Sequence, residues 1–299
     1  MPVIASVLYH HIGEATVFED GLGVTTRPDV FAAQIDWLSK HYTFINLDTL
    51  LSGVAPRNAL LLTFDDAFRS VLDVARAVLA PRGIPGVFFV NPGMLEVGAI
   101  SLDSVWCWAV NTFGIARACA AGGVPERDNL GAVLLSDMAD LGSREREAVR
   151  QRLLAAFGAP DLSGRAPLLA PGDLAELSEL GVEIGNHTAT HVHCRSLQPT
   201  EVVDEIVTAQ SRLSELSGRP VRSFSVPYGH KADLTPEVLE ALRQSGHEAI
   251  FLVHARSNRW RPAPDIWYRV NMANHSTDRL NTILNVAPVL RSLKAVFSS

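Results

Sequence analysis

The stretch Leu60-Leu61-Leu62-Thr63-Phe64-Asp65-Asp66 decides how this chain is interpreted. Its short apolar run, closed by polar residues, is typical of a buried strand in a parallel sheet. Two adjacent carboxylates stand where that strand ends. Because two carboxylates repel each other at close range, such a pair is costly without a cation or a different role for each group. An isolated Asp-Asp pair is usually a solvated strand end, so the interpretation depends on a second motif.

The second motif is Gly185-Asn186-His187-Thr188-Ala189-Thr190-His191, which follows a strand-like segment at residues 181–184. Polar residues at the carboxyl ends of parallel strands gather on one face of an α/β fold, where active sites are usually built. His187 and His191 are four residues apart, so a helical turn would place both imidazoles on one side. With one Asp they form a donor set that leaves metal positions open for water and substrate. The hydroxyl of Thr188 is expected to fix the backbone of this turn.

Composition and charge restrict the class of protein. The chain has 299 residues, of which 47% are hydrophobic, and this is enough for one large core. A net charge of −6 and the absence of a long Lys/Arg run argue against a nucleic-acid partner. No apolar run approaches the ~20 residues that cross a bilayer, and the start lacks the pattern of a signal peptide. These features predict a cytoplasmic protein without a membrane span, and the three cysteines predict no disulfide framework.

Strand and helix patterns alternate along most of the chain, which predicts an α/β fold with a parallel sheet. Thr235 and Pro236 are typical of a helix start, and Gly83 of a helix end. The count of about seven or eight strand units favours a closed or nearly closed barrel over an open sheet. We expect strands over residues 3–9, 43–46, 60–64, 86–90, 182–186, 221–226, 248–253 and 266–270, and helices over residues 28–42, 70–81, 173–180, 199–217 and 235–246.

Residues from about 100 to 171 interrupt this alternation. We interpret them as a mostly helical insertion within a single domain covering residues 1–299, because the segment is short for a large core of its own. Trp106 and Trp108 in this segment would suit a sugar-binding wall, although tryptophans at such positions more often serve packing. The tail at residues 278–297 has an amphipathic pattern that predicts a helix packed on the barrel.

Three motifs of the chain resemble the signature blocks of one family. Thr63-Phe64-Asp65-Asp66, His187-Thr188-x-x-His191 and Pro227-Tyr228-Gly229 are similar to those of the polysaccharide deacetylases, carbohydrate esterase family 4. The opening Leu8-Tyr9-His10-His11-Ile12 resembles the exopolysaccharide-deacetylase branch of this family. The resemblance covers most of the chain outside the insertion. It implies a deformed (β/α) barrel and the hydrolysis of N-acetyl groups on an amino-sugar or polysaccharide substrate.

The resemblance also implies roles for individual residues. Asp66, His187 and His191 would bind a divalent metal ion, most often zinc, with cobalt or nickel as alternatives. Asp65 would be the general base that deprotonates a water molecule placed by the metal, while the metal polarises the acetyl carbonyl. The oxyanion would lie against the metal and the backbone N–H of Tyr228.

Other family features are assigned on fewer matching residues. Pro227 would set the loop that carries Tyr228. His10 resembles the proton donor for the leaving amine, and His254 is the alternative. An Arg often stands two residues before the Pro-Tyr block to orient the base, but this chain has Ser225 there. We expect Arg269, at the end of the last predicted strand, to replace that Arg.

Two other functions compete with deacetylation. A cyclic-amide or other amide hydrolase on the same scaffold would usually lack part of the metal triad, which this chain retains. A non-catalytic carbohydrate-binding protein would not need the second carboxylate, Asp65.

Overall fold

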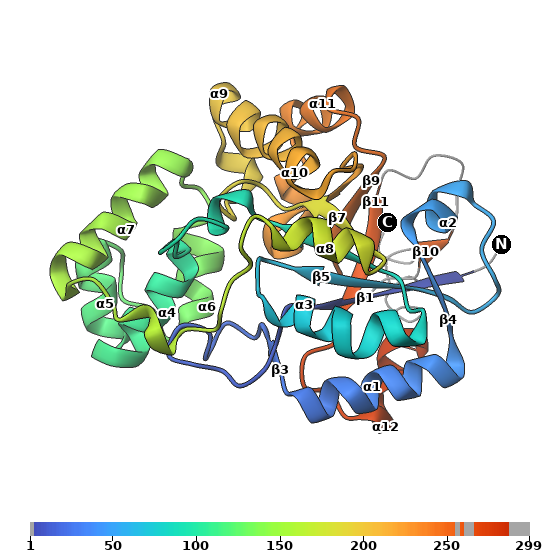
Figure 1. The fold of residues 1–299 in the computed structure, drawn as a ribbon. Helices are drawn as coiled ribbons and strands as arrows, with labels where there is room; N and C mark the ends of the chain where they lie inside the picture. Colours follow the sequence, from blue (N-terminus) through green and yellow to red (C-terminus); the bar gives the residue numbers. More distant parts are fainter. Residues whose placement is uncertain (1–2, 255–257, 260–265, 287–299) are drawn as a thin grey trace.

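A closed barrel of seven parallel strands forms the centre of the molecule (Figure 1). The computed structural model describes residues 3–254, 258–259 and 266–286. Neighbours in the barrel are also neighbours in chain order, and β1 pairs with both β5 and β11 to close the ring. The barrel strands are β1 (Val3–Tyr9), β5 (Ala59–Asp65), β6 (Gly86–Val90), β7 (Val182–Asn186), β8 (Ser223–Ser225), β9 (Ala249–Val253) and β11 (Ile266–Asn271). The predicted α/β barrel is therefore confirmed.

The barrel is deformed at β5. The first half of β5 pairs with β4 (Thr43–Ile45) and its second half pairs with β6, while β1 occupies the other edge. The predicted strand at residues 43–46 thus exists but lies outside the closed ring. β10 (Asn258–Arg259) adds an antiparallel partner to β1, and β2 (His11–Ile12) pairs with β3 (Thr25–Thr26) in a separate small sheet.

Helices cover the outside of the barrel, and their ends follow the predicted signals. The hydroxyl of Thr235 accepts the N–H of Val238 at 3.3 Å, and Pro236 is the first helical residue. Gly83 ends its helix with φ 63°, a left-handed conformation that glycine adopts without steric cost.

None of the helices in the described part of the chain has the length and apolar character needed to cross a membrane. The helices are α1 (Pro28–His41), α2 (Leu47–Ser52), α3 (Ser70–Val74, continued by helical turns to Arg82), α8 (Asp173–Glu179), α9 (Pro199–Val202, joined through Val203–Thr208 to α10, Ala209–Ser217), α11 (Pro236–Gln244) and α12 (Thr277–Asn281).

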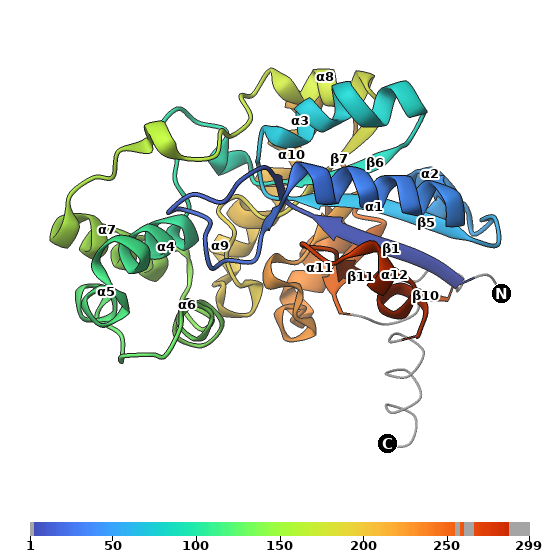
Figure 2. The same ribbon diagram turned by 90° about the horizontal axis from the view of Figure 1, so that it is seen from below.

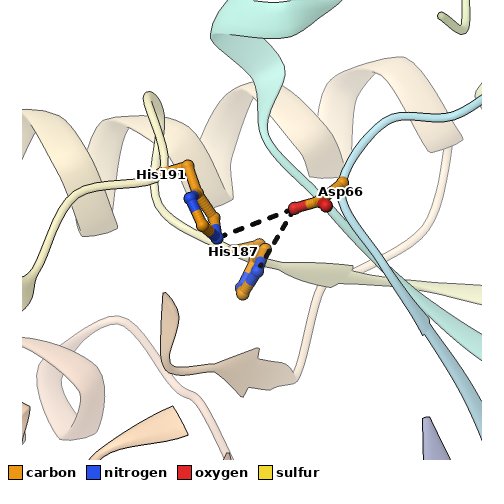
Figure 3. A group of neighbouring side chains, drawn as sticks. All are labelled: Asp66, His187 and His191. Carbon is orange, nitrogen blue, oxygen red and sulfur yellow. Dashed lines mark ion pairs between the residues drawn. The ribbon is translucent and has the colours of Figure 1, made fainter. Parts of the chain in front are cut away.

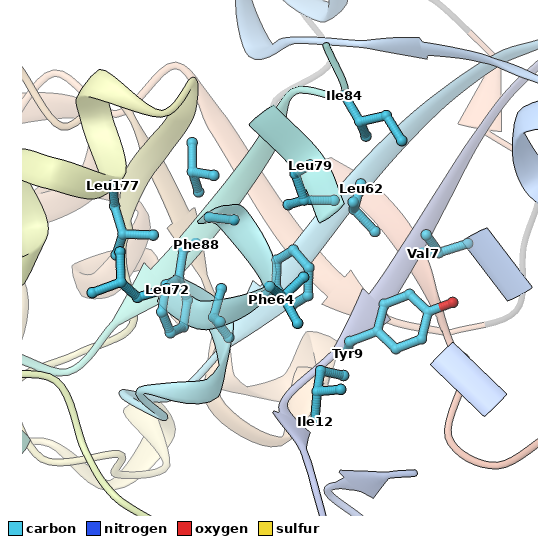
Figure 4. Packing of buried hydrophobic residues seen from close by; sticks show 14 of the residues in the cluster. Val7, Tyr9, Ile12, Leu62, Phe64, Leu72, Leu79, Ile84, Phe88 and Leu177 are labelled. Carbon is cyan, nitrogen blue, oxygen red and sulfur yellow. The ribbon is translucent and has the colours of Figure 1, made fainter. Parts of the chain in front are cut away.

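Strand β5 is buried at every position because it lies between two apolar layers. Leu60, Leu62 and Phe64 belong to the hydrophobic cluster that includes helix residues such as Leu72 and Leu177 (Figure 4). Leu61 belongs to a second cluster, made largely of residues from the other barrel strands. Side chains alternate between the two faces of a strand, so Leu61, Thr63 and Asp65 point to the same side of β5, toward the barrel interior. The pleat therefore directs Asp65 toward the barrel interior.

The insertion lies to one side of the barrel in both views (Figures 1 and 2). Contrary to our expectation from its length, it has a hydrophobic cluster of its own, which also takes in Phe18 from the loop after β2. Trp106 and Trp108 are 0% and 8% exposed within this cluster, so they serve packing and do not form a sugar-binding wall. Its helices are α4 (Leu102–Phe113), α5 (Ile115–Gly122), α6 (Leu130–Ala132, continued to Asp137) and α7 (Ser143–Phe157).

The start of the predicted tail helix is present as α12 and a following turn that reaches Val286. Leu280 and Leu284 are buried in the main cluster, as the amphipathic pattern predicts. The rest of that predicted helix, residues 287–297, lies outside the described residues.

Candidate active site

The residues predicted to bind metal come together where the barrel strands end (Figure 3). Asp66 directly follows β5, while His187 and His191 follow β7. The Nε2 atoms of both histidines lie 3.7 Å from Oδ1 of Asp66. One donor atom from each residue lies within 4.8 Å of the others. The two sequence motifs thus form one cluster in space.

Strained backbone positions surround this cluster. Asp66, Thr188, His191 and Tyr228 have φ values of 70°, 61°, 59° and 60°. Such left-handed conformations are costly for residues other than glycine and tend to occur at functional sites. As expected from the sequence, the hydroxyl of Thr188 fixes its turn by accepting the N–H of His191 at 3.0 Å. The side-chain amide of Asn91 donates to the carbonyls of His187 and Thr188 and so holds the same turn.

Both histidines are oriented by a contact of their Nδ1 atom. Nδ1 of His187 lies 2.7 Å from the carbonyl oxygen of Ser225, and Nδ1 of His191 lies 2.8 Å from Oδ2 of Asp103. A carbonyl and a carboxylate can only accept, so each Nδ1 is the donor, and in the neutral ring each Nε2 presents a lone pair. Burial lowers the pKa of His187 to about 4, although Asp65 opposes this shift. His187 is therefore neutral at physiological pH, as a metal ligand must be.

The three donors fit a divalent metal ion. Two imidazole nitrogens and one carboxylate match the ligands of catalytic zinc sites. Ligand atoms about 2.1 Å from one ion in tetrahedral geometry are themselves about 3.4 Å apart, which is close to the nitrogen–oxygen separations found here. The cluster is thus a candidate site for a divalent ion.

Asp65 is held in a different environment from its neighbour Asp66. The guanidinium of Arg269 donates to both carboxylate oxygens of Asp65, at 2.6 and 2.8 Å, and is itself fully buried. Arg269 also donates to the hydroxyl of Ser225 at 2.6 Å, and this hydroxyl lies 3.1 Å from Asp65. Burial raises the pKa of Asp65, but the charge of Arg269 and its hydrogen bonds outweigh burial and hold this pKa well below its usual range. Arg269 therefore lies against Asp65, and its role toward a catalytic base stays a prediction.

A pocket of about 400 Å³ is lined by Asp65, Asp66, His187 and His191. His10 lines it, whereas His254 is exposed and is not among the described residues that line it. Burial lowers the pKa of His10, while the charges of Asp66 and Asp65 oppose that change. Of the two histidines considered as proton donors, His10 shares the pocket with Asp66, His187 and His191, and His254 does not.

The Pro-Tyr-Gly block forms a tight turn after β8. Pro227 is buried and precedes Tyr228, which lines the pocket. Gly229 has φ 74°, and a Cβ at this position would lie 2.4 Å from the backbone nitrogen of Val253. Both the backbone conformation and this close approach require glycine, which explains the third residue of the block.

Three residues at the site were not predicted from the sequence, and two of them, Asp103 and Arg146, come from the insertion. Asp103 accepts the hydroxyl of Tyr228 at 2.8 Å, in addition to its contact with His191. Arg146 donates to Asp103 at 3.1 Å and is 5% exposed. Neither residue belongs to a motif or follows a barrel strand, so the sequence alone gives no signal for them. Asn91 was also missed, although it directly follows β6 and the position of active sites at strand ends would have indicated it.

Known structures share this fold. The deacetylase PplD of Streptococcus pyogenes, solved in complex with acetate, is 14% identical, with a TM-score of 0.64 over 95% of this chain and 100% of that one. IcaB from Ammonifex degensii is 19% identical, with a TM-score of 0.59 over 96% and 98% of the two chains. A de-N-acetylase from Aggregatibacter actinomycetemcomitans is 14% identical, with a TM-score of 0.59 over 92% and 96%. At these identities the likeness concerns the fold alone.

Sequence comparison gives the family. No curated protein matches the chain. The family model for polysaccharide deacetylase matches residues 52–250, which is well over half of the chain. This range contains the Asp65-Asp66 pair, both histidines of the candidate metal site and Tyr228, whereas His10 and Arg269 lie outside it. The chain therefore belongs to the polysaccharide deacetylase family.

Proposed function

We propose that the protein removes N-acetyl groups from an amino-sugar or polysaccharide substrate by metal-dependent hydrolysis. The observation that carries this proposal is one pocket in which a buried, ionised Asp65 lies beside the Asp66, His187 and His191 cluster. The names of the neighbouring structures, a deacetylase and a de-N-acetylase among them, support the same reaction.

Asp66, His187 and His191 would hold the ion, for which zinc is the first candidate and cobalt or nickel are alternatives. A bound divalent ion supplies Lewis-acid chemistry, which polarises a carbonyl group and makes water a stronger acid. The contacts of His187 with Ser225 and of His191 with Asp103 keep both Nε2 atoms directed toward Asp66.

Asp65 is the general base in this proposal. Its carboxylate accepts the proton of the attacking water, and Arg269 keeps it ionised and fixed in orientation until then. The resulting oxyanion would be stabilised by the backbone N–H of Tyr228, whose turn is set by Pro227.

His10 is the proton donor for the leaving amine. Since C–N cleavage expels a poor leaving group, the nitrogen must be protonated as the bond breaks. His10 lines the pocket together with both aspartates, whose charges favour the protonated imidazole against the effect of burial.

Replacing His10 by Asn should lower turnover of an N-acetyl amide by about 10²–10⁴-fold. The loss should be much smaller for an aryl acetate ester, because a phenolate leaves without a proton. The matched control is His254→Asn, which changes an exposed histidine outside the pocket and should leave both rates unchanged. Equal losses on the amide and the ester would contradict the role of His10 as proton donor.

Replacing Arg269 by Ala should lower turnover at least tenfold and destabilise the fold by about 3–5 kcal/mol, because it leaves the buried Asp65 carboxylate without its cation. Thermal unfolding and initial rates measure the two effects. The control is Arg243→Ala, which breaks an exposed ion pair with Glu240 and should change neither. An Arg269→Ala enzyme with unchanged turnover would remove Arg269 from the mechanism.

The proposed function is tested by incubating the zinc-loaded protein with N-acetylglucosamine oligomers. Deacetylation must release acetate and primary amine in equal amounts. Metal binding without either product would redirect the search to other amides, as for the amide hydrolases that share this scaffold.

A further inference from the structure

A residue in the first turn of α4 links the insertion to the donor cluster of Asp66, His187 and His191. Asp103 is the second residue of this helix, and its side chain leaves the hydrophobic cluster of the insertion to contact the barrel site. It is 7% exposed, so its charge must be compensated by partners inside the protein.

Three partners satisfy the Asp103 carboxylate. Oδ2 accepts Nδ1–H of His191 at 2.8 Å and the hydroxyl of Tyr228 at 2.8 Å. Oδ1 accepts the guanidinium of Arg146 at 3.1 Å. Two of these partners, His191 and Tyr228, are residues of the proposed mechanism.

From this arrangement we infer that Asp103 is a positioning residue, which fixes the tautomer and ring orientation of His191 and so tunes metal affinity from within the insertion. The inference rests on the proposed metal site. A carboxylate that accepts the second N–H of a ligating histidine raises the basicity of the ligand and prevents rotation of its ring. His187 has only a backbone carbonyl in the same position, so the two histidines are supported differently.

Further contacts of the insertion hold the same turn. Arg146 donates to the backbone carbonyl of His191 at 3.2 Å as well as to Asp103. Ser143, at the start of α7, donates to Glu205 at 2.8 Å, and Glu205 accepts the backbone N–H of Thr190 at 2.9 Å. The insertion therefore supports both the side chain of His191 and the backbone that carries it.

A second possible role for Asp103 is to stabilise the insertion through its ion pair with Arg146. Mutation of Asp103 would then have a different effect from the one expected for a positioning residue. Loss of such an Asp103–Arg146 pair would lower stability but leave the metal affinity of the folded protein unchanged. Loss of the acceptor for His191 lowers metal affinity itself, so the two roles are separated by measuring affinity in protein that is shown to be folded.

The test is titration of metal-free protein with cobalt(II), followed by visible absorption and by competition of zinc with a chelator. Asp103→Ala should bind both ions about 10–100-fold more weakly, with an altered cobalt spectrum. Asp103→Asn keeps an oxygen acceptor of nearly the same shape, so a smaller loss of the same sign is expected. Should the Ala variant not fold, the Asn variant decides alone.

Two further variants serve as references. Asp137→Ala breaks the Arg127–Asp137 pair, which belongs to the same insertion but does not line the pocket, and it should bind cobalt as the wild type does. His191→Ala removes the ligand itself and sets the size of a complete loss.

The outcomes separate this inference from the proposed function. Wild-type affinity and spectrum in folded Asp103→Ala would overturn the inference. If the Ala variant does not fold, unchanged metal affinity in Asp103→Asn would overturn it. A wild-type protein that binds metal but releases no acetate would reject deacetylation, while the Asp103 comparison would still decide the positioning role. A wild-type protein that binds neither ion would overturn both.

Discussion

His187→Ala should abolish stoichiometric metal binding and acetate release together. His187 supplies one of the three donors that the described residues bring together, and its Nε2 is buried and directed at Asp66. An alanine leaves two donors, which is too few for a zinc site that retains its ion through purification. Elemental analysis of freshly purified protein and an acetate assay on the same sample measure both effects.

The control for this variant is His230→Ala. His230 also lines the pocket but is not part of the donor cluster, so its alanine variant should keep one metal ion per chain. Full metal occupancy in His187→Ala would contradict the assignment of the site, whatever the activity.

Asp65→Asn should lower turnover by about 10²–10⁴-fold while metal binding persists. The amide keeps an oxygen for Arg269 but cannot take a proton from water at neutral pH. The neighbouring variant Asp66→Asn should instead lose the metal, because Asp66 contributes the only carboxylate of the donor cluster. Rates and metal content measured on both variants thus separate the roles of two adjacent carboxylates.

The opposite pattern would contradict the mechanism. If Asp65→Asn lost the metal and Asp66→Asn kept it, the ligand and the base would have been exchanged. If Asp65→Asn kept full turnover with its metal, another group would have to accept the proton from water.

Much of the barrel could be predicted because its strands carry a direct signal. β5 is apolar on both faces since it lies between two hydrophobic layers, and its pattern indicates a buried parallel strand. The position of β4 could not be predicted in the same way. A short strand next to β5 has the same pattern inside or outside the ring, and only the pairing of β6 with the second half of β5 excludes β4 from the barrel.

The site likewise contains residues that could be predicted from the sequence and others that could not. Asp66, His187 and His191 belong to motifs at strand ends, and Arg269 was predicted because it lies near the end of β11. Asp103 lies on an insertion helix, where an acidic residue in the first turn is common for reasons of helix stability alone. Its contact with His191 depends on how the insertion packs against the barrel, which is a tertiary property without a local pattern.

The most direct test of the account is acetate release by wild-type protein before and after removal of its metal. We expect metal-free protein to be inactive on N-acetylglucosamine oligomers, and one zinc ion per chain to restore the release of acetate and amine in equal amounts. Release of acetate at the same rate by metal-free protein would contradict the metal-dependent mechanism. A zinc-loaded protein that releases none from N-acetylated amino sugars or glycans would contradict the proposed activity itself.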